Sequence, residues 1–161
     1  MPTPDEMKEK FWNAVKSDRT MMVGLNGAHQ SHTRPMTALR DGETGPIWFF
    51  SSTDSELVRQ SATPQRALAT FVDKGHGLFA CIHGTIVQDT DRAMVDRLWN
   101  PFVAAWYDGG KTDPKLVLLR LDPGEAEIWH DGSSLLSAIR ILLGGDPQKD
   151  FSDSVAKVRL S

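Results

Sequence analysis

The sequence predicts a mainly β protein: a small antiparallel barrel of about six strands with flanking helices. Three observations lead to this fold class. Several short apolar runs have the length of strands, tight turns join most of them, and no regular alternation of strand and helix runs along the chain. Tight turns favour antiparallel pairing, whereas a parallel sheet needs helical crossovers. A chain of 161 residues suits one core, so we expect residues 1–161 to form a single domain.

The chain begins with an amphipathic helix over about residues 4–17. Apolar side chains recur at helical spacing at Met7, Phe11, Trp12 and Val15. A helix with one apolar stripe must bury it, so we expect this helix to pack on the sheet.

The next segments predict three strands. Thr20–Leu25 and Thr33–Leu39 flank the turn signal Asn26-Gly27, and Ile47–Ser51 follows as a third strand. Pro35 interrupts the second strand, and proline has no N–H to donate to a ladder. It therefore indicates a sheet edge, a bulge, or backbone that is left free to meet a ligand.

A short helix over residues 55–61 and a second hairpin follow. Arg66–Asp73 and Leu78–Gln88 have strand character, and the glycine-rich segment 74–77 lies between them. A third helix is predicted from Asp91, as its cap, to Trp99.

The last third of the chain predicts a short helical piece over 102–107 and two more strands. Lys115–Leu121 and Glu125–His130 flank Asp122-Pro123-Gly124, which has the composition of a turn. A helix over Ser133–Leu143 then begins a C-terminal helical tail, from about residue 133, that is loosely held after Gly145.

Composition argues against several classes of function. The formal net charge is −3, which gives no general attraction for nucleic acid or an anionic membrane. No apolar run approaches the roughly 20 residues that span a bilayer, and Met1–Trp12 does not resemble a signal peptide. Cys81 is the only cysteine. We therefore expect a protein of the reducing cytoplasm, without nucleic-acid or membrane partners.

A candidate phosphate site combines one arginine with a cluster of hydroxyls. Arg34 lies on a predicted strand, and Ser51, Ser52, Thr53 and Ser55 lie where another strand passes into a helix. A guanidinium fork matches a phosphate, and a helix N-terminus favours anions. Each feature alone has a simpler explanation, as a surface arginine or as helix caps. The combination predicts a phosphorylated cofactor, provided that the strands of Arg34 and Ser51 pair.

The other candidates also have two interpretations. Trp48, Phe49 and Phe50 are more typical of a core than of a ligand platform. A proline-broken helix is surrounded by Trp99, Trp106 and Tyr107, which could cover a planar ligand, contact a second subunit or join the core. Lys74, in the turn at 74–77, could reach a phosphate or simply be solvated.

Motifs of other classes are missing from the sequence. There is no Gly-x-Gly-x-x-Gly, no phosphate loop and no Gly-x-Ser-x-Gly. The five histidines lack the spacing of a zinc site, so no metal is expected.

Six segments in order resemble one known family. They are Thr33–Met36, Ile47–Phe50, Ile82–Thr85, Leu98–Pro101, Trp106–Gly110 and Ala126–Trp129. Together they resemble the general stress protein branch of the pyridoxamine 5′-phosphate oxidase-like, FMN-binding split-barrel proteins. The resemblance runs from about Lys10 to Trp129.

The resemblance implies a six-stranded split barrel that forms a homodimer with FMN at the subunit interface. Carried over by position, the cofactor-binding residues are Arg34, Pro35, Met36, Phe49, Phe50, Ser51 and Ser52, with Trp106 from the other subunit.

One departure from the family stands out. Members commonly place a lysine shortly after the hydroxyl cluster, whereas residues 54–58 here read Asp-Ser-Glu-Leu-Val. Lys74 could substitute, or Ser55 and the helix N-terminus could hold the phosphate. Otherwise flavin affinity would be weak, or another flavin would be preferred.

The leading functional hypothesis is a flavin-dependent oxidoreductase of a small molecule, linked to stress. The sequence does not identify a catalytic residue. The flavin would supply the redox chemistry. One alternative is a non-catalytic protein that binds or buffers flavin. Another is a haem-binding barrel that uses His76 or His83.

Overall fold

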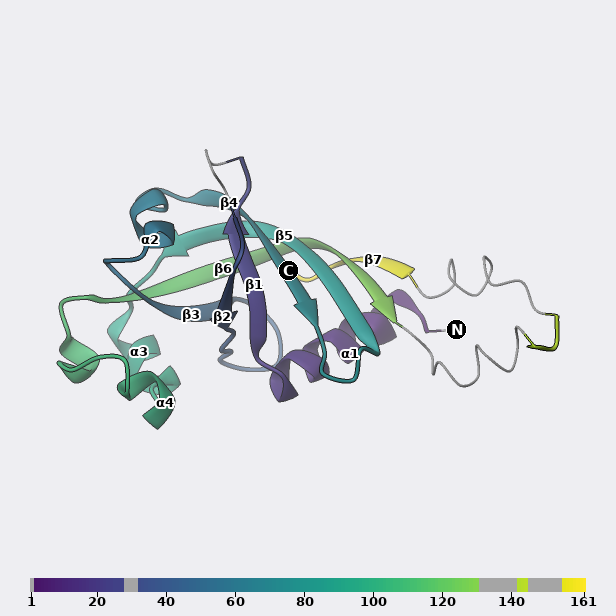
Figure 1. Cartoon of the computed structure of the whole chain (residues 1–161), viewed down its shortest axis with the longest axis horizontal. Coiled ribbons are helices and arrows are strands. Elements are labelled where there is room, and N and C mark those ends of the chain that lie inside the picture. Colours follow the sequence, from purple (N-terminus) through teal and green to yellow (C-terminus); the bar gives the residue numbers. More distant parts are fainter. Residues whose placement is uncertain (1, 28–31, 131–141, 145–154) are drawn as a thin grey trace.

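The computed structural model describes residues 2–27, 32–130, 142–144 and 155–161, and it is mainly β (Figure 1). In this part of the chain seven antiparallel strands form one sheet in the order β2-β1-β4-β5-β6-β3, with β7 paired to β6. The strands are β1 (Thr20–Leu25), β2 (Arg34–Thr37), β3 (Ile47–Ser52), β4 (Gln65–Val72), β5 (Leu78–Gln88), β6 (Leu116–His130) and β7 (Val155–Arg159). The helices are α1 (Pro4–Ser17), α2 (Glu56–Gln60), α3 (Arg92–Leu98) and α4 (Pro101–Ala104), with a 3₁₀ turn η1 (Gly110–Thr112).

The two ends of the strand order meet just beyond β2. Leu39 and Trp48 exchange two backbone hydrogen bonds of 2.8 Å each, and Trp48 belongs to β3. The strands therefore curve round until the chain that leaves β2 touches β3, which brings the two edge strands to the same side of the molecule.

α1 runs along one face of the sheet, whereas α2, α3 and α4 gather at the end where β3 ends and β6 begins (Figure 1). A capping box starts α1: Thr3 and Glu6 each accept a hydrogen bond from the other's backbone N–H. The helix buries Met7, Phe11, Trp12 and Val15, which confirms the predicted apolar stripe.

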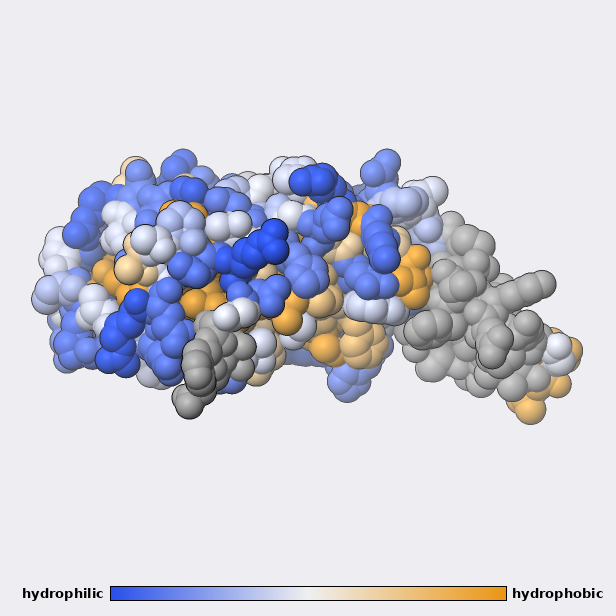
Figure 2. All heavy atoms as spheres, turned by 90° about the horizontal axis from the view of Figure 1, so that it is seen from above, coloured by the Kyte–Doolittle hydropathy of each residue, from blue (hydrophilic) through white to orange (hydrophobic). Residues whose placement is uncertain are grey.

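A second, smaller core holds α3 and α4 against the sheet. Its buried members come from the segment after β2, from β3 and β6, from α3 and from the segment after α4: they are Leu39, Trp48, Val95, Leu98, Tyr107, Leu116 and Leu118. The partly buried Val103 of α4 packs against them. This core fixes the α4 region beside the C-terminal end of β3. Seen from above the view of Figure 1, the surface of the molecule is mostly hydrophilic, with apolar side chains in separate areas between the polar ones (Figure 2).

The predicted turn at residues 122–124 is wrong, because β6 continues through it as a single strand. β6 pairs with β3 up to Leu121 and with β7 from Glu125, so that residues 122–124 lie between these two partners. Asp122 and Pro123 pair with β5. Between the pairs Ile82–Ala126 and Gly84–Pro123, β6 has one more residue than β5, which is a β-bulge. A proline is tolerated at such a position, since a bulge interrupts the ladder.

The described chain also has seven strands rather than six. β7 was not predicted, and it lies in the tail that we expected to be loosely held. Leu160, just after it, is buried and donates its N–H to Gly124 O at 3.0 Å. The predicted helix over 133–143, and with it most of the predicted helical tail, falls outside the described residues. No helix in the described ranges is long and apolar enough to cross a membrane.

Candidate functional site

A cavity of about 1200 Å³ lies between β2, the end of β3 and the α4 region. We call it the β2–α4 cavity. Seven of the ten residues that the sequence nominated line it: Pro35, Met36, Phe50, Ser51, Ser52, Ser55 and Trp106. It thus joins segments that lie far apart in the sequence, and its volume exceeds the usual size of a small-molecule site.

β2 supplies one wall of the cavity. It lies at one end of the strand order and pairs with β1, Pro35 facing Met22 across the ladder. This edge position explains why a proline is accepted there. Arg34 precedes Pro35 but is not among the lining residues; its Nη2 lies 3.3 Å from His32 Nε2, and its enclosed Nε has no hydrogen-bond partner.

The end of β3 supplies hydroxyl groups. Ser51 and Ser52 are half-buried, and Ser55 precedes α2 without using its side chain as a cap. Its hydroxyl is therefore not committed to capping. α2 has only five residues, so its dipole adds less to anion binding than the sequence suggested.

Tyr107, one of the three aromatic residues that the sequence offers as a cover for a planar ligand, ties the α4 region to β3. Its hydroxyl donates a hydrogen bond of 2.6 Å to Ser51 O. Burial, with a smaller contribution from the negative charge of Asp113, raises the pKa of Tyr107 to about 12. The ring packs near Phe50 and Trp99 at centroid distances of 6.4 and 6.1 Å. These three aromatic rings make a rigid, apolar side of the site.

Lys115 is a cation at the site that the sequence reasoning missed. It lines the cavity, and its Nζ lies 2.8 Å from Asp54 Oδ2. The backbone fixes its place, because Thr53 N donates to Lys115 O at 2.9 Å. The hydrogen bond from Lys115 to Asp54, together with the charge of Asp54, raises the pKa of Lys115. Lys115 and Asp54 are 61 residues apart, so only the pairing of β3 with β6 could have revealed their contact.

Besides Arg34, two residues that the sequence predicted for the site do not line the cavity: Phe49 and Lys74. Phe49 is 0% exposed and belongs to the main core. Lys74 lies in the turn between β4 and β5, near the end of β6 that pairs with Leu78, whereas Ser52 faces the other end of β6. A single chain therefore does not bring Lys74 to the hydroxyl cluster.

The strands of Arg34 and Ser51 do not form the expected ladder. β2 and β3 are joined only through the bridge between Leu39 and Trp48, and they meet again as two walls of the β2–α4 cavity. The histidines considered for haem, His76 and His83, do not line this cavity. Among the described residues, no three His, Cys, Asp or Glu side chains come together as metal ligands.

Two aromatic side chains at the mouth of the cavity are almost fully exposed. Trp106 is 84% exposed and Phe102, on α4, is 85% exposed. Large aromatic side chains in water are unusual on a monomer and are enriched at interfaces.

The fold and the cavity define a class: an antiparallel β protein with a ligand-sized cavity between its two edge strands and a helical segment. A family model described as "Pyridoxamine 5′-phosphate oxidase like" matches residues 6–145. The chain therefore belongs to the pyridoxamine 5′-phosphate oxidase-like family, which confirms the resemblance seen in the sequence.

Solved structures of general stress proteins are similar to this chain. The general stress FMN/FAD binding protein from Xanthomonas citri is 57% identical, with a TM-score of 0.77 and coverage of 81% of this chain and 92% of that one. A protein of Xanthomonas campestris pv. campestris, provisionally assigned to the general stress family, is 56% identical, with a TM-score of 0.78 and coverage of 83% and 93%. The Neurospora crassa protein bli-3 is 29% identical over 94 residues, which are 52% of this chain and 45% of that protein. The chain thus matches less than half the length of this fungal relative.

Proposed function

We propose that the protein binds FMN in the β2–α4 cavity and is a flavin-dependent oxidoreductase of a small molecule, linked to stress. The observation that carries this proposal is the convergence of Pro35, Met36, Ser51 and Ser52 on one large cavity. The Xanthomonas citri relative, named as an FMN/FAD binding protein, supports the same class of ligand. When bound, a flavin would supply hydride or electron transfer, which side chains alone do not provide.

The residues present fit the two ends of a flavin. Ser51, Ser52 and Ser55 would donate hydroxyl hydrogen bonds to the phosphate. Lys115, which lines the same cavity, would supply a cation in place of the lysine that family members commonly carry. Arg34 does not line the cavity, so its side chain would have to change rotamer to bring its unpartnered Nε to the phosphate, an anion to which that donor is suited. Phe50 would pack against the ring system beside Tyr107 and Trp99.

We further propose that the functional unit is a homodimer of split barrels in the cytoplasm. Each barrel would be a single domain, in which β1–β6 form the six-stranded barrel and β7 is added to it at β6. The exposed Trp106 and Phe102 support a second subunit that covers the mouth of the cavity. Phe49, which the sequence predicted as a flavin ligand, would support the site only by packing in the core and would not touch the flavin. Lys74 would contribute only across the dimer, given its place at the far end of β6.

The alternative is a non-catalytic protein that binds or buffers flavin. Asp54 favours the non-catalytic alternative, because its carboxylate lies among the hydroxyls and already forms an ion pair with Lys115. A negative charge there would weaken the binding of a phosphate. Stopped-flow reduction of the bound flavin by NADH or NADPH distinguishes the two: turnover supports the oxidoreductase, and binding without reduction by any donor supports the buffer.

The test of the proposed site compares FMN with riboflavin, which lacks the phosphate. Arg34→Ala should weaken FMN about 10-fold to 100-fold, the usual contribution of a hydrogen bond to a charged group, and leave riboflavin nearly unchanged. Equilibrium dialysis with absorption spectroscopy measures both affinities and the number of flavins per chain. Arg59→Ala removes the same charge from exposed α2 and serves as the control. Equal losses for both ligands would rule out Arg34 as a phosphate ligand.

A further inference from the structure

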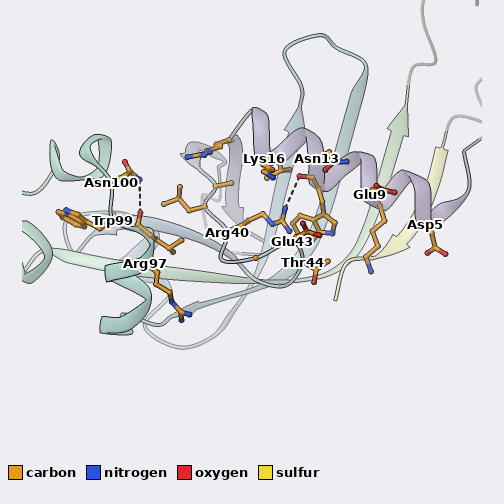
Figure 3. A pocket seen from close by; sticks show the side chains of 18 residues that line it. Asp5, Glu9, Asn13, Lys16, Arg40, Glu43, Thr44, Arg97, Trp99 and Asn100 are labelled. Atoms are coloured by element: carbon orange, nitrogen blue, oxygen red, sulfur yellow. Dashed lines mark hydrogen bonds between the residues drawn. The ribbon is translucent and has the colours of Figure 1, made fainter.

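A second cavity, of about 740 Å³, lies between α1, the segment 38–44 and the junction of α3 with α4 (Figure 3). We call it the Arg40 cavity. Its volume lies within the range of small-molecule sites. Figure 3 shows Arg40 and Glu43 beside α1, with Arg97 and Trp99 on the side of α3 and α4.

Arg40 is held in place with one edge of its guanidinium unused. Its Cζ lies 4.1 Å from the centroid of the Trp12 ring, a cation–π contact. Nη1 donates to Trp12 O at 3.4 Å. Nε and Nη2 are enclosed and have no hydrogen-bond partner. These two donors form the side edge of the fork, the arrangement that binds two oxygens of one carboxylate or phosphate.

The charges around Arg40 favour an anion. The lining holds five cations, Lys8, Lys16, Arg19, Arg40 and Arg97, and three carboxylates, Asp5, Glu9 and Glu43. Arg97 forms an ion pair with Asp41 at 3.1 Å, whereas neither free donor of Arg40 is paired. Burial lowers the pKa of Arg40, and the charge of Glu43 opposes this effect without a hydrogen bond to the free edge.

The Arg40 cavity adjoins the β2–α4 cavity but has its own chemistry. Arg19, Leu39 and Asn100 line both. Arg40 and Trp12 line only the smaller of the two. A ligand at Arg40 would therefore lie next to the larger cavity without needing to enter it.

We propose that the Arg40 cavity binds a small organic anion, a carboxylate or a phosphate ester, through the side edge of the Arg40 guanidinium. Trp12 orients the guanidinium, and Lys16 and Arg19 add positive charge, whereas the nearby carboxylate of Glu43 competes with the anion electrostatically. This site goes beyond the proposed flavin function and does not depend on it.

The test titrates the full chain separately with inorganic phosphate and with acetate. Isothermal titration calorimetry at constant ionic strength measures the binding of each probe. We expect saturable binding of at least one probe, at one site per chain. The tighter probe then identifies phosphate or carboxylate as the recognised group. If neither probe saturates below about 10 mM, an affinity near the weak end of specific binding, the proposal is overturned.

Two variants should shift this binding in opposite directions. Arg40→Met keeps an apolar side chain over Trp12 and should weaken the better probe at least tenfold, whereas Glu43→Gln should tighten it several-fold by removing the competing carboxylate. Arg59→Met, outside both cavities, should leave it unchanged. Since Arg40→Met could fail to fold, Glu43→Gln tests the site independently. Unchanged binding in Arg40→Met or in Glu43→Gln would contradict the proposal, whatever the flavin experiments show.

Discussion

Tyr107 is the only tyrosine of the chain, so its ionisation can be followed without interference from another phenol. Its pKa is raised from 10.0 to about 12, first by burial and then by Asp113. The hydroxyl therefore stabilises the fold fully below pH 10, and this contribution is lost as the pH rises through about 12.

The measurement is an ultraviolet absorption titration of tyrosinate. We expect a midpoint near pH 12 in the folded protein and near pH 10 in denaturant. Tyr107→Phe, which removes the titrating group, gives the baseline. A folded-state midpoint near pH 10 would show that the hydroxyl is not enclosed as its hydrogen bond to Ser51 O implies.

Gly84 lies where the neighbouring backbone leaves no room for a side chain. A Cβ at this position would lie 2.5 Å from Asp122 O, at the β-bulge of β6. Gly84→Ala should therefore destabilise the protein by about 1–3 kcal/mol, as overpacking does. Thermal or urea unfolding measures the loss. Gly75→Ala is the matched control, because its Cβ would meet nothing closer than 3.6 Å and should change stability by less than about 0.5 kcal/mol.

At the scale of elements, local patterns were sufficient wherever an element depends on its own residues. α1 has the predicted bounds, because its apolar stripe and capping box lie within one segment. β6 shows the opposite case: Asp122-Pro123-Gly124 has the composition of a turn, but β6 stays extended there because it pairs with β3 before this segment, with β5 along it and with β7 after it. Tertiary pairing overrides local propensity there, and no window of the sequence contains that information.

The candidate site was predictable to a similar degree. Pro35 and the serines of β3 were found because a proline in a strand and hydroxyls after an aromatic strand are local signals. Lys115 was missed, since it reaches the site through a contact with Asp54, 61 residues away. Tyr107 was recognised only as one of three aromatic residues by the broken helix, because its hydrogen bond to Ser51 joins residues 56 positions apart. Lys74 shows the converse: a basic residue in a glycine-rich turn has no local feature that places the turn in the molecule, and within one chain that turn lies at the end of β6 away from Ser52.

At the scale of the whole molecule, the exposed Trp106 provides a test of the proposed dimer. A side chain that is 84% exposed contributes little to the stability of one chain. Trp106→Ala should therefore leave monomer stability nearly unchanged while weakening self-association, by about 2 kcal/mol or more if Trp106 is an interface hot spot. Light scattering over a concentration series measures the dissociation constant.

The control is Trp99→Ala, which removes an aromatic ring from the cluster with Phe50 and Tyr107. It should lower the stability of each chain. A wild-type protein that stays monomeric at micromolar concentrations and still binds flavin would contradict a site shared between subunits.

The pairing of β7 with β6 has a consequence for the order in which this protein can be completed during synthesis. The sheet edge at Glu125–Trp129 is covered by Val155–Arg159, which leave the ribosome well after β6. Until then the nascent chain carries an open strand edge, the feature through which unfinished sheets pair with one another. The same delay applies to α1: although it is made before the strands, it packs against β5, β6 and β7, so the surface that it binds is complete only after β7 has been made.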